Sequence, residues 1–210
     1  MTVRTRILAP TWQNMGAVVA ALKAGQPVAF PTDTVYGLGT LAGNEEAVAR
    51  LYEVKGRGEG KPIALLLADA EDLALVSVAV PEKAHLLAQR YWPGALTIVL
   101  PSQDWVPEVV RAGGPNVGVR VPDHELTREL IRRAGSPLAT TSANRSGQAS
   151  LRRADEVWTE LHGLIEYIVE GECPGGVAST VVDLSVDPPV ILREGAIPRA
   201  EIEAVLAGAS

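Results

Sequence analysis

The segment from Lys55 to Pro62 holds the residues that point most directly to chemistry. It places three cations (Lys55, Arg57 and Lys61) and three glycines within eight residues of a protein whose formal net charge is −6. Glycine lets backbone N–H groups approach a ligand closely, and clustered cations neutralise a polyphosphate better than scattered lysines do. The segment therefore indicates an anion-binding loop, with a solvated linker as the alternative. It is not a Walker A loop, because Pro62 replaces the magnesium-binding hydroxyl and the glycines are one residue too close.

A second polar segment follows the apolar run at residues 27–30. Thr32, Asp33 and Thr34 place two hydroxyls and a carboxylate at the carboxyl end of this predicted strand, where ligands of open α/β sheets gather. The alternative is that these side chains only cap a turn. The pattern G-x-G-x-x-A at residues 37–42 also matches part of a dinucleotide-binding fingerprint, but the match is weak, since no acidic residue ends a following strand.

The run VGVRVP at residues 117–122 contains the next candidate. Strand alternation places its three valines on one sheet face and Arg120 on the other, beside the small Gly118. Arg120 then lies over open space next to glycine, where it could hold an anion. An arginine in solvent on an edge strand is the alternative.

The remaining candidates lie at the ends of three later strands. Three consecutive hydroxyl residues at 140–142 precede Asn144, and hydroxyls with an amide can bind phosphate oxygens or the water shell of a cation. Capping of a following helix is the competing account, although Gly147 argues against an immediate helix. Ser179 and Arg193 stand at the start and the end of two further apolar runs.

These residues need a scaffold that alternates strands with helices, so one mixed α/β domain is the predicted architecture. Caps and apolar spacing predict helices at residues 13–24, 45–55, 82–90, 124–134, 154–161 and 199–207. Apolar runs predict strands at residues 27–30, 63–68, 96–100, 117–121, 137–140, 165–170, 180–184 and 190–193. The turn Trp92-Pro93-Gly94 is predicted to bury its indole.

Composition excludes several classes of protein. The 210 residues are 47% hydrophobic with only nine aromatics, which rules out a disordered chain and predicts an aliphatic core. Cys173 is the only cysteine, so no intrachain disulfide forms, a catalytic thiol is not expected, and a reducing cytoplasm is predicted. No secretory leader and no membrane span are expected, and the three histidines lack ligand spacing. Since the pI is near 5.2, any polyanion site must be local.

Taken together and in order, the motifs resemble one family, the YrdC-like L-threonylcarbamoyladenylate synthases. The resemblance rests on PTDTVYGLG, Lys55-x-Arg57, Lys61-Pro62, WPGALTIVL, VGVRVP, Ser142-x-Asn144, Ser179-Thr180 and LREG. It implies a single YrdC-like domain over residues 1–210 with a motif core at 27–193, built on a twisted mixed sheet with flanking helices and a concave basic cleft. It also implies the short form of the family, without a second domain as a lid.

The implied reaction joins L-threonine, bicarbonate or CO2, and ATP to give threonylcarbamoyl-AMP and pyrophosphate. This is the first step toward N6-threonylcarbamoyladenosine at position 37 of tRNA, and downstream tRNA threonylcarbamoyl-transfer enzymes are the implied partners. Magnesium is expected to arrive with ATP, with no metal ligands from the protein and no tightly bound prosthetic group. The family pattern implies catalytic Lys55 and Arg57; threonine-binding Thr34, Arg120, Thr140 and Ser179; and nucleotide-binding Arg57, Lys61, Ser142, Asn144, Ser150 and Arg193.

Two other functions stay open at this point. The same fold can serve as an RNA-binding module, in which Lys55, Arg57, Arg152 and Arg153 grip the phosphate backbone. A paralogue that uses another carbamate acceptor, such as the related domain of hydrogenase-maturation carbamoyltransferases, is the second alternative.

Gly58 follows Arg57 where relatives usually have proline, which predicts a more mobile loop.

Overall fold

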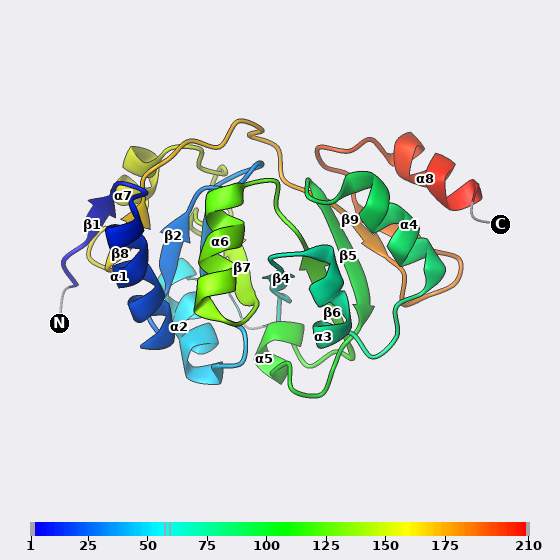
Figure 1. Cartoon of the computed structure of the whole chain (residues 1–210), viewed down its shortest axis with the longest axis horizontal. Coiled ribbons are helices and arrows are strands. Elements are labelled where there is room, and N and C mark those ends of the chain that lie inside the picture. The colour runs from blue at the N-terminus through cyan, green and yellow to red at the C-terminus, as the bar shows by residue number, and fades with distance from the viewer. Residues whose placement is uncertain (1–2, 57, 59, 209–210) are drawn as a thin grey trace.

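The molecule is built around a mixed β-sheet. The computed structural model describes residues 3–56, 58 and 60–208, and in these the sheet has ten strands in the order β1-β8-β2-β3-β7-β4-β6-β5-β9-β10 (Figure 1). The strands are β1 (Arg6–Leu8), β2 (Val28–Phe30), β3 (Gly37–Leu41), β4 (Ala64–Leu66), β5 (Leu96–Pro101), β6 (Asn116–Arg120), β7 (Leu138–Ser142), β8 (Tyr167–Val169), β9 (Thr180–Asp183) and β10 (Val190–Arg193). The predicted α/β class with a mixed sheet and flanking helices is confirmed.

The strand directions divide the sheet into parallel and antiparallel pairs. The parallel pairs are β1/β8, β2/β8, β4/β6 and β5/β9, and the antiparallel pairs are β2/β3, β3/β7, β4/β7, β5/β6 and β9/β10. Short loops join the antiparallel neighbours β2/β3, whereas the parallel neighbours need long crossovers. Segments far apart in the sequence therefore lie side by side in the middle of the sheet.

All six predicted helices are present, and two four-residue helices and a short 3-10 turn at Ala70–Asp72 were not predicted. The helices are α1 (Trp12–Lys23), α2 (Glu45–Lys55), α3 (Leu73–Val76), α4 (Glu82–Tyr91), α5 (Glu108–Arg111), α6 (Glu125–Ala134), α7 (Ala154–Leu161) and α8 (Arg199–Ala207). One turn of helix carries too little apolar periodicity to be recognised in a sequence.

Helix α2 shows why the predicted boundaries hold. The Asn44 side chain accepts a hydrogen bond from the Ala47 N–H at 3.0 Å, and two glutamates occupy the first turn, where the helix dipole favours them. Gly56 ends the helix in the left-handed conformation at φ +60°. These caps bring Lys55 to the end of the helix beside the predicted anion-binding loop.

Strands β1 and β3 were missed. The three residues of β1 are too few to show a pattern, while β3 reads as a loop because it contains Gly37 and Gly39. The glycines are needed for packing: a Cβ on Gly37 would lie 2.9 Å from the Phe30 ring, and one on Gly39 would lie 2.8 Å from Thr140 Oγ1. The G-x-G pattern therefore lies in a strand between two close neighbours and is not a dinucleotide-binding turn.

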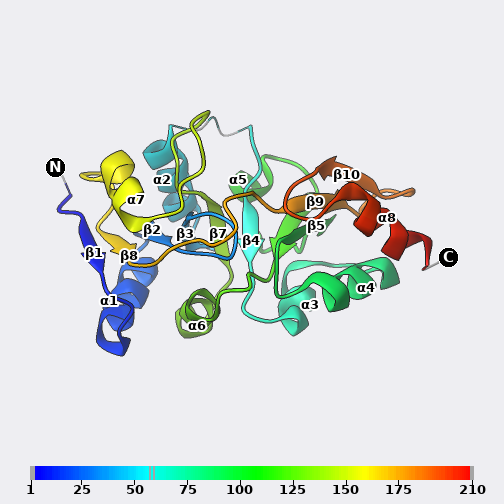
Figure 2. The same cartoon turned by 90° about the horizontal axis from the view of Figure 1, so that it is seen from above.

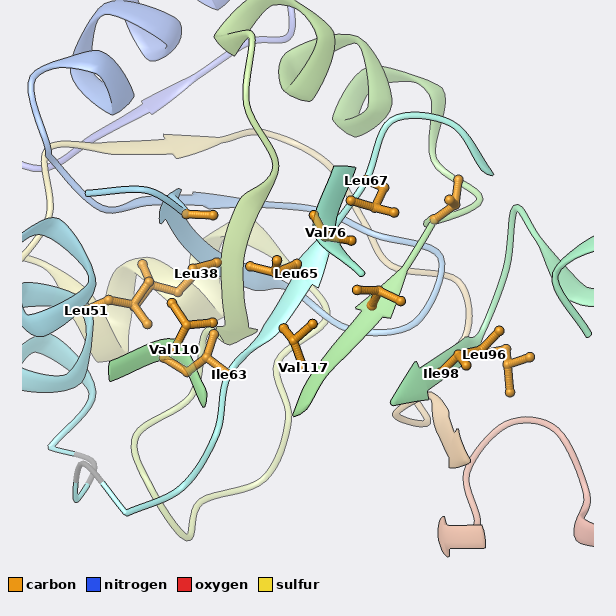
Figure 3. Close-up of a cluster of buried hydrophobic side chains, with 14 of the residues drawn as sticks. Leu38, Leu51, Ile63, Leu65, Leu67, Val76, Leu96, Ile98, Val110 and Val117 are labelled. Atoms are coloured by element: carbon orange, nitrogen blue, oxygen red, sulfur yellow. The ribbon is translucent and has the colours of Figure 1, made fainter. Parts of the chain in front are cut away.

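Two apolar clusters hold the helices on the sheet. The smaller cluster joins α1 and α6 to Val28, Phe30 and Leu138, and the larger one joins α2, α4, α7 and α8 to the central strands. Figure 2 shows α1 and α6 on one side of the sheet and α2 and α7 on the other. Figure 3 shows part of the larger cluster, where Leu65 and Val117 meet side chains from α2 and α5. As predicted, aliphatic residues dominate this core.

The described helices are also informative about membranes. None of the helices in residues 3–56, 58 and 60–208 is both long enough and apolar enough to cross a bilayer.

Candidate functional site

A cavity of about 500 Å³ lies over the strands β3, β7, β4, β6, β5, β9 and β10. Strand alternation explains its position: Val117 and Val119 point into the core, whereas Gly118 and Arg120 line the cavity, as the run VGVRVP predicted. The sequence pointed to strand ends, but the cavity also covers strand interiors. The reason is that small side chains in mid-strand leave the space open.

The floor of the cavity consists of these small residues. Gly37, Ala64 and Gly118 come from three different strands, and Thr140 lies between the first two. An added Cβ at Gly118 would lie 3.2 Å from Thr97 Cγ2. Larger residues at these positions would fill the cavity, so the floor indicates a site for a ligand that lies flat across the sheet.

One end of the cavity is formed by Thr32, Thr34, Thr97, Arg120, Ser179 and Arg193, and we call it the arginine end. Arg120 is 7% exposed and makes three hydrogen bonds, from Nε to the Gly94 carbonyl at 2.9 Å, from Nη1 to Thr34 Oγ1 at 2.9 Å, and from Nη2 to Asp33 Oδ1 at 2.5 Å. Burial lowers the pKa of Arg120, and the Asp33 carboxylate opposes this shift by stabilising the cation. Arg120 is thus a buried, oriented cation at the cavity wall.

The hydroxyl groups beside Arg120 form a chain of hydrogen bonds in which the direction of each donor is fixed. The Thr32 hydroxyl donates to the Val35 carbonyl at 2.8 Å, so its oxygen can only accept from Thr34 Oγ1, which lies 3.0 Å away. Thr34 Oγ1 in turn accepts from Arg120. Since the Thr34 hydrogen is committed to Thr32, what Thr34 can offer a ligand is a lone pair.

Ser179 and Arg193 complete the arginine end from the C-terminal part of the chain. Arg193 donates to the Ser179 carbonyl through Nε at 3.1 Å and Nη2 at 2.8 Å, and Nη2 also lies 3.2 Å from Ser179 Oγ. Thr97 Oγ1 lies 2.8 Å from the same hydroxyl. Gly195 must be glycine here, because an added Cβ would fall within 2.6 Å of the Ser179 backbone.

The other end of the cavity is formed by Pro62, Arg111, Asn116, Ser142 and Ser150, and we call it the loop end. Arg120 and Asn116 are four residues apart on β6, so the two ends are separated by roughly 13 Å at about 3.3 Å per residue. Lys55 lies behind the loop end: Nζ donates to the Ser142 carbonyl and, at 2.9 Å, to Ser142 Oγ. Lys55 is only 3% exposed.

Comparison with known proteins identifies the family. Residues 20–195 match the Sua5/YciO/YrdC family, whose description is telomere recombination. The chain belongs to the Sua5/YciO/YrdC family. The resemblance inferred from the ordered motifs is therefore confirmed.

Three relatives illustrate the similarity of this Sua5/YciO/YrdC chain. The threonylcarbamoyl-AMP synthases of Pyrococcus abyssi and Bacillus subtilis are each 46% identical to it, over 186 and 195 residues that cover 88% and 92% of this chain. The crystal structure of P. abyssi Sua5 complexed with L-threonine matches with a TM-score of 0.90 at 44% identity, covering 97% of this chain and 59% of that one. The matches cover 55% and 56% of the two synthases, so the chain spans a little over half of their length.

The family's candidate residues fall into three groups in the structure. Those that line the cavity are Thr34, Arg120, Thr140, Ser142, Ser150, Ser179 and Arg193. Lys55, Lys61 and Asn144 are not among the lining residues: Lys55 contacts Ser142, Lys61 is exposed, and Asn144 is buried with its Nδ2 bound to the Arg145 and Gln148 carbonyls. Arg57, to which both a catalytic and a nucleotide-binding role were assigned, lies outside the described residues.

Other residues of the Sua5/YciO/YrdC site were not assigned from the sequence. Thr32, Thr97, Arg111 and Asn116 line the cavity, and Asp33 pairs with Arg120. Asp33 and Thr32 belong to the PTDT segment, where capping of a turn was the competing interpretation; the contact with Arg120 shows that the segment builds the site. The Trp92-Pro93-Gly94 turn buries its indole as predicted, and its Gly94 carbonyl also holds Arg120.

Two further observations bear on the chemistry available to this family member. Burial raises the pKa of the Cys173 thiol to about 11, so the thiol stays protonated at neutral pH. Within residues 3–56, 58 and 60–208 there is no group of three or more His, Cys, Asp or Glu side chains that could hold a metal ion.

Proposed function

We propose that this protein is a threonylcarbamoyl-AMP synthase, which converts L-threonine, bicarbonate or CO2, and ATP to threonylcarbamoyl-AMP and pyrophosphate. The observation that carries the proposal is one cavity with a buried, oriented arginine among hydroxyls at one end and a serine-lined end roughly 13 Å away. An amino acid and a nucleotide fit end to end in such a space. The names of the relatives and the threonine complex of P. abyssi Sua5 support the same function.

In this proposal threonine binds through Thr34, Arg120 and Ser179 of the arginine end and through Thr140 on the cavity floor. The three hydrogen bonds of Arg120 use three of its five N–H groups, so one N–H on each terminal nitrogen is left for the substrate carboxylate. The lone pair of Thr34 accepts a hydrogen bond from the substrate hydroxyl or nitrogen. A site that pairs with a hydroxyl discriminates against amino acids that lack one.

ATP binds in this proposal through Ser142 and Ser150 of the loop end and Arg193 of the arginine end, together with Arg57, Lys61 and Asn144. Lys55 and Arg57 are the proposed catalytic cations; the Lys55 ammonium group lies directly behind Ser142. Mg2+ enters with ATP and would neutralise part of the triphosphate charge, in keeping with its preference for substrate phosphates. The carboxamide oxygen of Asn144 is buried and has no hydrogen-bond partner among the described residues, so it is an acceptor that a donor group of the nucleotide would satisfy.

The chemical step is an attack by a carbamate oxygen of N-carboxythreonine on the α-phosphorus of ATP. The new P–O bond forms as the bond to the pyrophosphate oxygen breaks, and pyrophosphate leaves with the electron pair. Both reactants are anions, so the protein contributes chiefly by holding them in line and by neutralising charge. The charged side chains that line the described cavity, Arg111, Arg120 and Arg193, suit this task, and no protein nucleophile is required.

The proposal extends to the setting of the enzyme. We place the whole chain, residues 1–210, in one YrdC-like domain with its functional core at 27–193 and a concave basic cleft, and we place the protein in the cytoplasm. Its product would pass to the enzymes that transfer the threonylcarbamoyl group to tRNA.

The test is to incubate the pure protein with ATP, Mg2+, bicarbonate and either L-threonine, L-serine or L-valine, and to detect the acyl-adenylate and pyrophosphate. We expect threonine to give the most product and valine the least. Absence of any threonine-dependent adenylate would refute the proposal. RNA binding that needs no ATP and weakens steeply with salt would indicate the RNA-binding module instead.

A further inference from the structure

Asp33 places a negative charge where the proposed function needs a positive one. Its side chain is 14% exposed and forms an ion pair with Arg120, whose side chain is 8% exposed. A carboxylate beside the residue that is proposed to bind the substrate carboxylate either competes with the substrate or orients the arginine that binds it. The geometry of the pair distinguishes these two roles.

The contact between the two residues involves one oxygen and one nitrogen. Asp33 Oδ1 binds only Nη2 of Arg120, while Thr34 binds Nη1 and the Gly94 carbonyl binds Nε. Each of the three guanidinium nitrogens thus has one protein acceptor. A competitor for the substrate site would bind both terminal nitrogens, as a bidentate carboxylate does.

Asp33 is itself fixed from two directions. Its Oδ1 also accepts the backbone N–H of Asp123 at 3.1 Å, and its carbonyl accepts the Gly175 N–H at 3.1 Å. Gly175 passes so close that a Cβ there would lie 2.5 Å from the Asp33 carbonyl oxygen. The Asp123 N–H therefore anchors the carboxylate and Gly175 anchors the main chain of Asp33, so the carboxylate does not need to leave when a ligand arrives.

We propose that Asp33 is a positioning residue: its carboxylate fixes the plane of the Arg120 guanidinium so that one N–H from each terminal nitrogen meets the carboxylate of the amino-acid substrate. This inference rests on the proposed function. It explains why a buried anion is retained at an anion-binding site, because an arginine without it would keep its charge but lose its orientation.

The main test is Asp33→Asn, which keeps the size of the side chain and an oxygen acceptor but removes the charge. We expect kcat/KM for threonine to fall about tenfold, mostly through KM, while KM for ATP stays within about twofold. Asp123→Asn is the matched control, since it removes an equal charge from an exposed side chain of the neighbouring loop and should leave both KM values unchanged. Unchanged or tighter threonine binding in Asp33→Asn would mean that Asp33 competes with the substrate, and would overturn the proposal.

A double-mutant cycle with Arg120→Lys tests whether Asp33 acts through Arg120. A lysine ammonium has no plane to orient, so adding Asp33→Asn to Arg120→Lys should change KM for threonine by less than about twofold. Fully additive losses would overturn the proposal, because Asp33 would then act independently of Arg120. Asp33→Glu, which keeps the charge but moves it by one methylene, gives a second variant if Asp33→Asn melts early, and it should also raise KM for threonine.

Failure of the inference differs from failure of the proposed function. If the wild-type protein forms no threonine-dependent adenylate, the proposed function is wrong and the inference falls with it. If the wild type is active and Asp33→Asn and Asp33→Glu, folded as judged by thermal unfolding, both show wild-type kinetics for threonine, only the inference is wrong.

Discussion

The arginine end and the loop end of the cavity differ in what holds their side chains. At the arginine end Thr34, Arg120 and Ser179 are at most 7% exposed, and each has hydrogen-bond partners within the protein. At the loop end Ser150 is exposed and Ser142 is half-buried. The first end is organised before a ligand arrives. At the second end Arg111, Asn116 and Ser142 also have protein partners, whereas the exposed Ser150 can gain a partner from the ligand itself. Substitutions at the arginine end should therefore affect both folding and binding, and substitution of Ser150 should affect binding alone.

The largest effect is expected from Arg120→Ala. Loss of the guanidinium removes the proposed partner of the substrate carboxylate and leaves the largely buried Asp33 without its counter-charge, so kcat/KM for threonine should fall about 100-fold. The melting temperature should fall as well, because a buried ion pair that loses one partner is strongly destabilising. Steady-state kinetics and thermal unfolding measure the two effects. Arg90→Ala, which removes an exposed arginine, is the control. Unaltered threonine kinetics in Arg120→Ala would contradict the assignment of the arginine end.

Arg193→Ala should come next, because Arg193 is proposed to lie between the two substrates. It binds Ser179 and is proposed to face the nucleotide, so its loss should cost about 2 kcal/mol of transition-state stabilisation, about thirtyfold in rate. Adenylate synthesis at varied ATP and varied threonine separates the two contributions. Near-normal adenylate synthesis by Arg193→Ala would contradict a role for Arg193 in the site. Arg199→Ala, at the exposed start of α8, controls for the loss of one positive charge.

Thr32→Val should have a smaller effect, confined to the arginine end. The valine keeps the volume but removes the acceptor of the Thr34 hydroxyl, so the Thr34 hydrogen is no longer directed away from the substrate. We expect KM for threonine to rise about fivefold and stability to fall by about 1 kcal/mol in urea unfolding. Thr32→Ser keeps the hydroxyl and should behave as wild type. Identical behaviour of the two variants would show that the hydroxyl chain is irrelevant.

The smallest effect is expected from Ser150→Ala at the loop end. Ser150 is exposed, so the expected loss is its proposed contact with the nucleotide: KM for ATP should rise about threefold, with threonine kinetics and melting temperature unchanged. Ser146→Ala, in the same exposed segment, is the matched control. An equal shift in KM for threonine would erase the distinction between the two ends.

The sequence was most informative where the determinants are local. The caps of α2, the left-handed Gly56 and the alternation around Arg120 act within a few residues, and each was predicted correctly. Strand β3 was missed because its glycines are required by the close packing of Phe30 and Thr140 on neighbouring strands. Contacts between strands are not encoded in the local propensity of a segment.

The site shows the same limit. For Asp33 the sequence left a ligand site and a turn cap as alternatives, because its partner Arg120 is 87 positions away in the sequence, and the Gly94 carbonyl became part of the site only through the fold. Lys61 was assigned to the nucleotide by the family resemblance; its side chain is exposed and its backbone carbonyl accepts a hydrogen bond from the Tyr52 hydroxyl, and the assignment stays a prediction. The chemical types of residue were evident from the sequence, and their mutual distances were not.

The segment at residues 170–179, which crosses the molecule between β8 and β9 in Figure 1, has a consequence for folding. Its Cys173 accepts from the Thr32 N–H, a contact between residues 141 positions apart, and it leads directly into Ser179. The arginine end therefore exists only when early and late parts of the chain have met, and closing such a long loop carries an entropic cost. Threonine should consequently bind the native state alone and raise the midpoint of unfolding, so the substrate itself would act as a reporter of completed folding.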